Sequence, residues 1–178
     1  ILQLNGIPLI VYSIRAALSS HLVDKVVVST DSCEIAKVAS DAGAEVEMRG
    51  EELSGDTATT MDVLKDLLIR LDSYHICVTL QPTSPLRNAN DVTKSLELFN
   101  KMNADAVVSV CKVEHPPQWI NTIGSNGEMD EFLREEFQNI RSQDLGDYFR
   151  LNGAIYCNSV QRLLSSNSPV FKSNCYAY

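Results

Sequence analysis

Short apolar segments alternate with amphipathic segments along most of the chain. Three segments rich in β-branched residues predict strands over residues 24–30, 75–80 and 105–111. Their nearly continuous apolar character is typical of strands that a sheet buries on both faces. A shorter run, Ala44 to Met48, predicts one more strand.

The segments between these strands carry apolar residues at helical spacing. A helix is expected after Pro8, because Ile10, Ile14 and Ala17 fall on one face. Further helices are expected around residues 35–42, 61–71 and 92–99. Strict alternation of strand and helix is typical of a parallel sheet covered by helices. The sequence therefore predicts an α/β fold, a three-layer, doubly wound and mainly parallel sheet, in a single domain over residues 1–178.

The alternation stops at Lys112. About 38 residues follow before Arg150, against the usual 2–6 residues of a connection. Such an insertion is usually a lid or an oligomerisation arm, and we interpret residues 112–148 as an arm. A strand is expected again over residues 152–157, followed by a short helix around residues 160–164.

Composition narrows the classes of function. The chain has 178 residues, of which 44% are hydrophobic, and a net charge of −8, which argues against a nucleic-acid partner. No apolar run approaches the roughly 20 residues that span a membrane. The five scattered cysteines form no C-x-x-C pair, which favours a reducing, cytoplasmic compartment.

The strand at 75–80 breaks abruptly into a polar loop, Gln81 to Arg87. Pro82 and Pro85 end the strand, because proline cannot donate to a strand ladder. A polar loop at the carboxyl end of an apolar strand is where an open α/β sheet binds its ligand. The alternative is an ordinary connection rich in turn-forming residues.

Other polar groups follow the predicted strands at the same edge. Residues 29–31 follow one strand, and Lys112, Glu114 and His115 follow another. A second group combines Arg49 with the loop Gly55 to Thr60, which enters a helix whose amides could receive a phosphate. The alternative for this loop is a helix cap made by Asp56 or Thr57.

Several known mechanisms lack their motifs in this sequence. It contains neither G-x-G-x-x-G nor G-x-x-x-x-G-K-[ST], and no G-x-S-x-G frames Ser84. The three histidines lack metal-ligand spacing.

Five motifs occur in the order and spacing of one enzyme family. They are Val28-Ser29-Thr30-Asp31, Arg49 with Asp56-Thr57-Ala58, Leu80 to Arg87, Glu114-His115-Pro116-Pro117, and Arg150-Leu151-Asn152-Gly153-Ala154-Ile155-Tyr156. Across essentially its whole length the chain resembles the acylneuraminate cytidylyltransferases, the CMP-sialic acid synthetases and their bacterial relatives acting on legionaminic-type sugars.

The resemblance implies a reaction and a set of binding residues. The reaction is Mg²⁺-dependent transfer of CMP from CTP to a nonulosonic acid, with release of pyrophosphate. The implied nucleotide-binding residues are Arg49, Asp56, Thr57, Ala58, Thr60 and Gln81. The implied substrate-binding residues are Gln81, Thr83, Ser84, Arg87, Arg150, Asn152, Tyr156 and Phe171. Residues 112–148 would form the dimerisation arm of a homodimer.

The chain also departs from the family pattern. The phosphate loop of the family is expected before Ile1, and its metal-binding Asp-x-Asp pair after Tyr178, so we expect a middle part of a longer protein with no metal ligand of its own. These residues alone are expected to be inactive. Ser142 stands where many relatives have a second arginine. Two alternatives stay open: a 3-deoxy-octulosonate type transferase, and a nucleotide-binding homologue that has lost catalysis.

Overall fold

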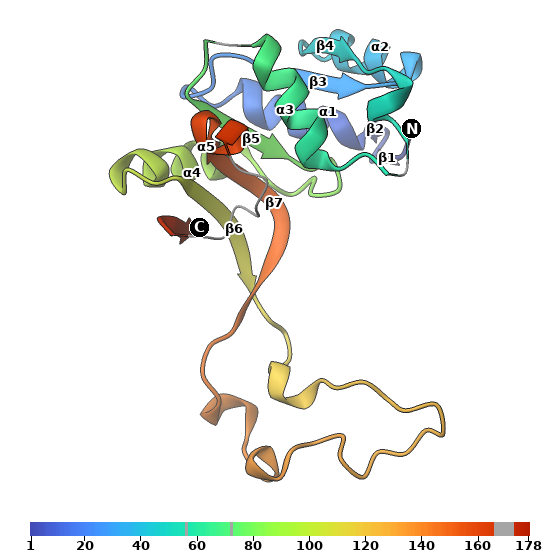
Figure 1. The fold of residues 1–178 in the computed structure, drawn as a ribbon, viewed down its shortest axis with the longest axis vertical. Helices are drawn as coiled ribbons and strands as arrows, with labels where there is room; N and C mark the ends of the chain where they lie inside the picture. The colour runs from blue at the N-terminus through green and yellow to red at the C-terminus, as the bar shows by residue number, and fades with distance from the viewer. Residues whose placement is uncertain (56, 72, 166–172) are drawn as a thin grey trace. The chain divides into compact units, whose positions relative to one another are not determined.

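The computed structural model describes residues 1–55, 57–71, 73–165 and 173–178. Within them the chain forms two compact units (Figure 1). The first comprises Ile1–Ser109 and Gly153–Tyr178, and the second comprises Val110–Asn152. The helices are α1 (Leu9–Leu18), α2 (Cys33–Asp41), α3 (Thr60–Arg70), α4 (Ala89–Lys101) and α5 (Val160–Ser165). The strands are β1 (Gln3–Leu4), β2 (Ile7–Pro8), β3 (Val27–Thr30), β4 (Glu45–Met48), β5 (Ile76–Leu80), β6 (Ala106–Lys112), β7 (Phe149–Ser159) and β8 (Cys175–Ala177).

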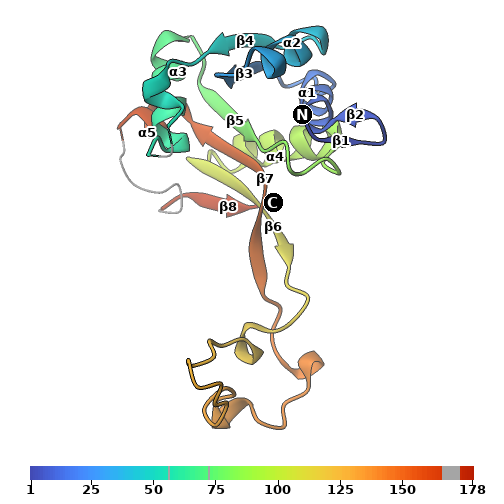
Figure 2. The same cartoon turned by 90° about the vertical axis from the view of Figure 1, so that its right-hand side faces the viewer.

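The strands of the first unit form separate sheets. Strands β3 and β4 pair in parallel, and the order β5-β7-β6-β8 makes up a second sheet (Figure 2). Strand β8 is parallel to β6, whereas β7 is antiparallel to β5. The predicted α/β class is confirmed, with a sheet that is mixed. Strand β7 follows the long second unit rather than a helical crossover, so the rule that keeps successive strands parallel does not apply to it.

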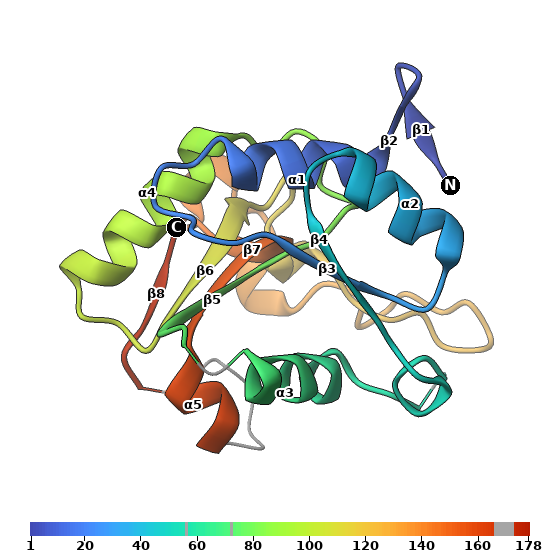
Figure 3. The ribbon, with the colours of Figure 1, turned by 90° about the horizontal axis from the view of Figure 1, so that it is seen from above.

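Helices cover the strands on two faces, as Figure 3 shows from above. Helices α1, α2 and α4 lie on one face, and α3 and α5 lie on the other. The buried apolar residues form three clusters rather than one. One lies around Ala16, Leu96 and Ile155, one around Ile14 and Ala39, and one around Leu68 and Leu163. A domain usually has one contiguous core, so three separate clusters are unusual.

Polar side chains fix the beginnings of the helices. The side-chain oxygen of Asn88 accepts hydrogen bonds from the amides of Asn90 and Asp91 at the start of α4, where the sequence predicts a cap. Helix α3 begins with a capping box in which Thr59 and Asp62 bond reciprocally. The alternative that Asp56 or Thr57 caps this helix is therefore wrong. The hydroxyl and amide of Thr59 lower the pKa of the Asp62 carboxyl.

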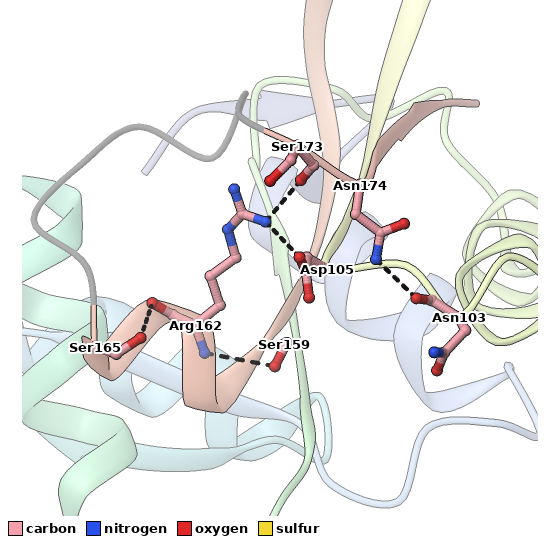
Figure 4. A network of polar contacts seen from close by, with 7 residues as sticks. All are labelled: Asn103, Asp105, Ser159, Arg162, Ser165, Ser173 and Asn174. Carbon is pink, nitrogen blue, oxygen red and sulfur yellow. Dashed lines mark hydrogen bonds and ion pairs between the residues drawn. The ribbon is translucent and has the colours of Figure 1, made fainter.

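A network of polar contacts ties β8 to the start of β6 and to α5 (Figure 4). The Arg162 guanidinium donates to Asp105 at 2.7 Å and to the carbonyl of Ser173 at 2.8 Å. The Asn174 side chain donates to the carbonyl of Asn103 at 2.8 Å. These contacts hold an edge strand of only three residues in place.

The second unit, Val110–Asn152, contains the predicted arm and has little regular structure between its strand ends. Its short 3₁₀ helices are Pro117–Trp119, Glu135–Phe137 and Ser142–Asp144. Its two ends are joined by the amide of Val113, which donates to the carbonyl of Tyr148 at 3.0 Å, and by an ion pair between Lys112 and Asp147. Several large apolar side chains of this unit are exposed, namely Ile120, Ile123, Met129, Tyr148, Phe149 and Leu151.

Candidate functional site

A cavity of about 780 Å³ lies inside the first unit. Strands β3 and β5 and helices α1, α3 and α4 line it, together with residues 22–26 and 73–75, Arg49 and the loop around Gly55. A volume of this size is within the usual range of ligand-binding pockets. The sequence predicts that β3 and β5 are buried on both faces, and this is wrong for most of their residues. They are only half-buried, because they line this cavity.

Arg49 follows β4 directly and lines the cavity together with Ser54, Gly55 and Thr59, a group that we call the polar end of the cavity. Its amide donates to the carbonyl of Thr30 at 2.9 Å, which holds the backbone beside β3. Its guanidinium approaches Asp31 at 3.6 Å, a long ion pair. The Nε of Arg49 is buried and makes no hydrogen bond to any residue that the structure describes. The guanidinium therefore has free donor capacity at the cavity wall.

The loop before α3 brings two further predicted nucleotide-binding residues to the same cavity. Ala58 and Thr60 line it, and the amide of Ala58 donates to the carbonyl of Gly55 at 3.0 Å. Thr57 is exposed and does not line the cavity. Asp56 lies outside the described residues. Arg49, Ala58 and Thr60 are thus brought together, although they come from two different loops.

The polar loop after β5 is a tight turn organised by the carbonyl of Gln81. This carbonyl accepts the amide of Ser84 at 3.2 Å and the Ser13 hydroxyl at 3.4 Å. Gln81 and Thr83 are exposed and Ser84 is half-buried, so all three are accessible to a ligand. Of this turn, Pro82 lines the cavity.

Arg87 differs from the other predicted substrate-binding residues because it is 7% exposed. Its guanidinium donates to the carbonyl of Ala154 on β7 at 2.7 Å, to the carbonyl of Gln81 at 3.2 Å, and to the hydroxyl of Ser13 on α1. Burial lowers the pKa of Arg87, and the charge of Asp91 opposes this effect. The predicted sugar contact stays a prediction. The observed contacts hold the loop against α1 and β7.

Gly153 belongs to one of the five motifs, and the motif alone assigns it no role. Its φ is +73°, a left-handed conformation that favours glycine. A Cβ at this position would lie 2.6 Å from Oε1 of Gln81. The absence of a side chain at Gly153 therefore fixes where the Gln81 side chain can lie. A glycine inside a strand is the signal that could have found it.

The remaining predicted substrate-binding residues are Arg150, Asn152, Tyr156 and Phe171. Tyr156 is half-buried on β7, where it pairs with Thr79 of β5. Arg150 and Asn152 belong to the second unit; Arg150 is exposed and Asn152 half-buried. Phe171 lies outside the described residues.

The described part of the chain contains no group of three or more His, Cys, Asp or Glu side chains that could hold a metal ion. Asp31, the acid beside the cavity residue Arg49, pairs with that guanidinium. The described residues therefore offer no cluster of side chains for Mg²⁺. None of the helices within the described ranges has both the length and the apolar character to cross a bilayer.

Curated relatives match nearly the whole chain. It is 36% identical over 179 residues to an N-acylneuraminate cytidylyltransferase of Streptococcus agalactiae serotype V, covering 99% of this chain and 43% of that protein. It is 34% identical over 171 residues to the CMP-N,N'-diacetyllegionaminic acid synthase of Legionella pneumophila, covering 93% of this chain and 72% of that protein. The chain thus spans less than half the length of the streptococcal relative.

Solved structures of low identity share the fold. A CMP:2-keto-3-deoxy-manno-octonic acid synthetase complexed with CTP has a TM-score of 0.66 at 19% identity, over 91% of this chain and 67% of that one. A 4-diphosphocytidyl-2C-methyl-D-erythritol synthase from Anaerococcus prevotii has a TM-score of 0.64 at 11% identity, over 99% of this chain and 78% of that one. These likenesses support the α/β fold alone.

The family model described as cytidylyltransferase matches residues 1–158. Together with the relatives above 30% identity, this match confirms the family predicted from the five motifs. The chain belongs to the cytidylyltransferase family.

Proposed function

We propose that the protein carrying this chain transfers CMP from CTP to a nonulosonic acid of the sialic or legionaminic type, releasing pyrophosphate. The observation that carries the proposal is the identity of 34–36% to two proteins named for such reactions, over 93–99% of the chain. The lower identity of 19% to the octonic acid synthetase makes that substrate the alternative.

The nucleotide is proposed to lie at the polar end of the cavity. The Nε of Arg49 bonds to no residue that the structure describes, and a guanidinium is suited to a phosphate or to the carbonyl of a base. Ala58 lies just before α3, and Thr60 is the first residue of this helix. The amides at the amino terminus of a helix favour an anion. Thr57 and Asp56 stay predicted members of this group.

The sugar is proposed to contact the exposed side of the loop after β5. Gln81, Thr83 and Ser84 offer an amide and two hydroxyls, the groups that hydrogen-bond a polyhydroxylated acid. The buried Arg87 guanidinium holds this loop in position through its hydrogen bonds. Arg150, Asn152, Tyr156 and Phe171 stay predicted contacts of the same substrate.

The chemical contribution of these residues is positioning and charge neutralisation. Attack of the sugar hydroxyl on the α-phosphorus builds negative charge on phosphoryl oxygens, which cations and amides at fixed positions stabilise. Mg²⁺ stays a predicted cofactor, and it would neutralise charge on the phosphates when bound.

The first test is a pyrophosphate-release assay on the complete gene product that contains these residues, with CTP, Mg²⁺ and a panel of nonulosonic acids. We expect release with a sialic or legionaminic acid. We expect no release by the 178-residue chain alone. In the complete gene product, we expect Arg49→Met to raise the KM for CTP about tenfold, as for a lost charge-assisted hydrogen bond. Arg15→Met, an exposed arginine on α1, is the matched control.

The outcomes separate the alternatives. Release with 3-deoxy-octulosonate and with none of the nonulosonic acids would favour the second transferase. CTP binding without release on the whole panel would favour a nucleotide-binding homologue that has lost catalysis. Turnover by the isolated chain would contradict its predicted inactivity.

The partner of the second unit is proposed to be a second copy of the protein. The exposed apolar side chains of this unit, among them Ile120, Ile123 and Phe149, are the kind of surface that an interface covers. Light scattering on the complete protein is expected to give the mass of a dimer, and a monomer at micromolar concentration would contradict the proposal.

The five cysteines are free, which supports the proposed cytoplasmic location.

A further inference from the structure

Helix α1 buries one hydroxyl among apolar side chains. Its buried residues are Val11, Ser13, Ile14, Ala16 and Ala17. Ser13 is 6% exposed and lies in the middle of the helix, where serine is less favourable than alanine. A buried hydroxyl also costs free energy unless it is hydrogen-bonded, so the partners of Ser13 indicate what it does.

The partners of Ser13 lie far away in sequence. Its hydroxyl donates to the carbonyl of Gln81 at 3.4 Å and accepts a hydrogen bond from the Arg87 guanidinium. A guanidinium can only donate, so the single hydroxyl hydrogen of Ser13 is directed at Gln81. A serine inside a helix can bond back to the preceding turn of that helix, whereas Ser13 bonds to the loop after β5.

Ser13, Gln81 and Arg87 form a closed ring of hydrogen bonds. Arg87 donates to the carbonyl of Gln81 at 3.2 Å through one terminal nitrogen and to Ser13 through the other. Ser13 completes the ring by donating to the same carbonyl. Because two bonds of the ring start from one planar guanidinium, the ring fixes both the distance and the direction of the Gln81 carbonyl.

The place of the Gln81 side chain depends on this backbone position. A Cβ on Gly153 would lie 2.6 Å from Oε1 of Gln81, so the side-chain amide lies against Gly153. The nitrogen of Arg87 that bonds to Gln81 also donates to the carbonyl of Ala154, the next residue along β7, at 2.7 Å. The same guanidinium thus holds both sides of the contact between Gln81 and Gly153, and Ser13 joins it to α1.

We propose that Ser13 is a positioning residue for the proposed reaction, whose hydroxyl holds Gln81 where the Gln81 side chain meets both substrates. The inference rests on the proposed function, because Gln81 is a predicted contact of the nucleotide and of the sugar. Ser13 acts through Gln81 and touches neither substrate. Loss of its hydroxyl would leave a terminal nitrogen of Arg87 without this acceptor and the Gln81 carbonyl with one donor fewer, which loosens the loop from α1.

Three substitutions at Ser13 separate the hydroxyl from the space that the side chain fills. Ser13→Ala removes the hydroxyl, Ser13→Thr keeps it, and Ser13→Val has nearly the shape of threonine without a hydroxyl. Ser20→Ala is the matched control. Ser20 is also buried, just after α1, but its hydroxyl bonds to Thr93 of α4 at 2.8 Å and not to the loop after β5.

The first measurement is hydrogen exchange of residues 81–87 in the complete gene product, followed by mass spectrometry. The amide of Ser84 donates to the Gln81 carbonyl at 3.2 Å, so its exchange reports whether this turn stays closed. We expect exchange at least tenfold faster in Ser13→Ala and Ser13→Val, and exchange at the wild-type rate in Ser13→Thr and Ser20→Ala. Unchanged exchange in Ser13→Ala would overturn the inference, whatever the assay of activity gives.

The second measurement is steady-state pyrophosphate release, at a temperature where urea unfolding shows every variant to be fully folded. We expect kcat/KM to fall about tenfold for both CTP and the sugar in Ser13→Ala and Ser13→Val. Ser13→Thr should stay within twofold of the wild type, and Ser20→Ala should lose stability without losing activity. A purely structural role of Ser13 would not produce this difference between two buried serines.

The two measurements separate this inference from the proposed function. An inactive wild-type protein would contradict the proposed function, and the exchange result would still decide whether Ser13 holds the loop. An active wild type with the same kcat/KM as Ser13→Ala would overturn the inference alone. In a Gln81→Ala background, Ser13→Ala should change kcat/KM less than twofold, because the side chain that it positions is absent. A further tenfold loss in that background would also overturn the inference, since Ser13 would then act by another route.

Discussion

Replacing Arg87 by methionine is expected to lower the free energy of unfolding by about 3 kcal/mol, a large share of the 5–15 kcal/mol typical of a domain. The guanidinium is buried and donates to Ala154, Gln81 and Ser13. Methionine fills a similar volume but leaves these buried acceptors without a donor, which costs more than the bonds themselves contribute. Urea unfolding followed by circular dichroism measures the change.

Two further variants serve as controls for Arg87→Met. Arg87→Lys keeps the charge and some of the donors, so we expect it to recover part of the loss. Arg15→Met removes an exposed arginine from α1, and we expect it to change stability by less than about 0.5 kcal/mol. Unchanged stability of Arg87→Met together with a raised KM for the sugar would contradict the structural role and favour direct substrate contact.

The helices and the strand positions were largely predictable because their signals are local. The apolar periodicity of α1 and the cap at Asn88 lie within single stretches of sequence. The cap of α3 was less predictable, because one Asp and three Thr residues occur between residues 56 and 60, and Thr59 is the one that caps the helix.

Strand pairing was less predictable, because it joins residues that are far apart in sequence. The direction of β7 depends on how the chain returns from the second unit, which apolar patterning does not encode. The patterning of β3 and β5 predicts strands buried on both faces, yet the structure leaves most of their residues half-buried along the cavity.

The sequence predicted which residues bind the nucleotide and which bind the sugar, and these roles stay predictions. Arg49, Ala58 and Thr60 do meet at one cavity, as their shared motif suggests. The burial of Arg87 could not be read from the sequence, because α1 and β7, which cover it, lie about 70 residues away on either side. The role of Gly153 depends on its φ and on the Gln81 side chain, and neither follows from composition.

Gly153→Ala is expected to impair function as well as stability. The φ of +73° makes alanine unfavourable by about 1–2 kcal/mol. The new Cβ would also meet Oε1 of Gln81, the free end of a flexible side chain, so Gln81 would move rather than the backbone. If Gln81 contacts the substrates as proposed, we expect kcat/KM of the complete protein to fall about tenfold, as for the loss of one hydrogen bond to substrate.

Gly6→Ala is the matched control for this effect. Gly6 has a φ of +75°, nearly that of Gly153, but a Cβ there meets no atom within 4 Å. We expect a similar loss of stability in urea unfolding and unchanged kcat/KM. Combining Gly153→Ala with Gln81→Ala should reduce kcat/KM no further than Gln81→Ala alone, because both changes then remove the same contact. Additive losses would show that Gly153 acts on the reaction independently of Gln81.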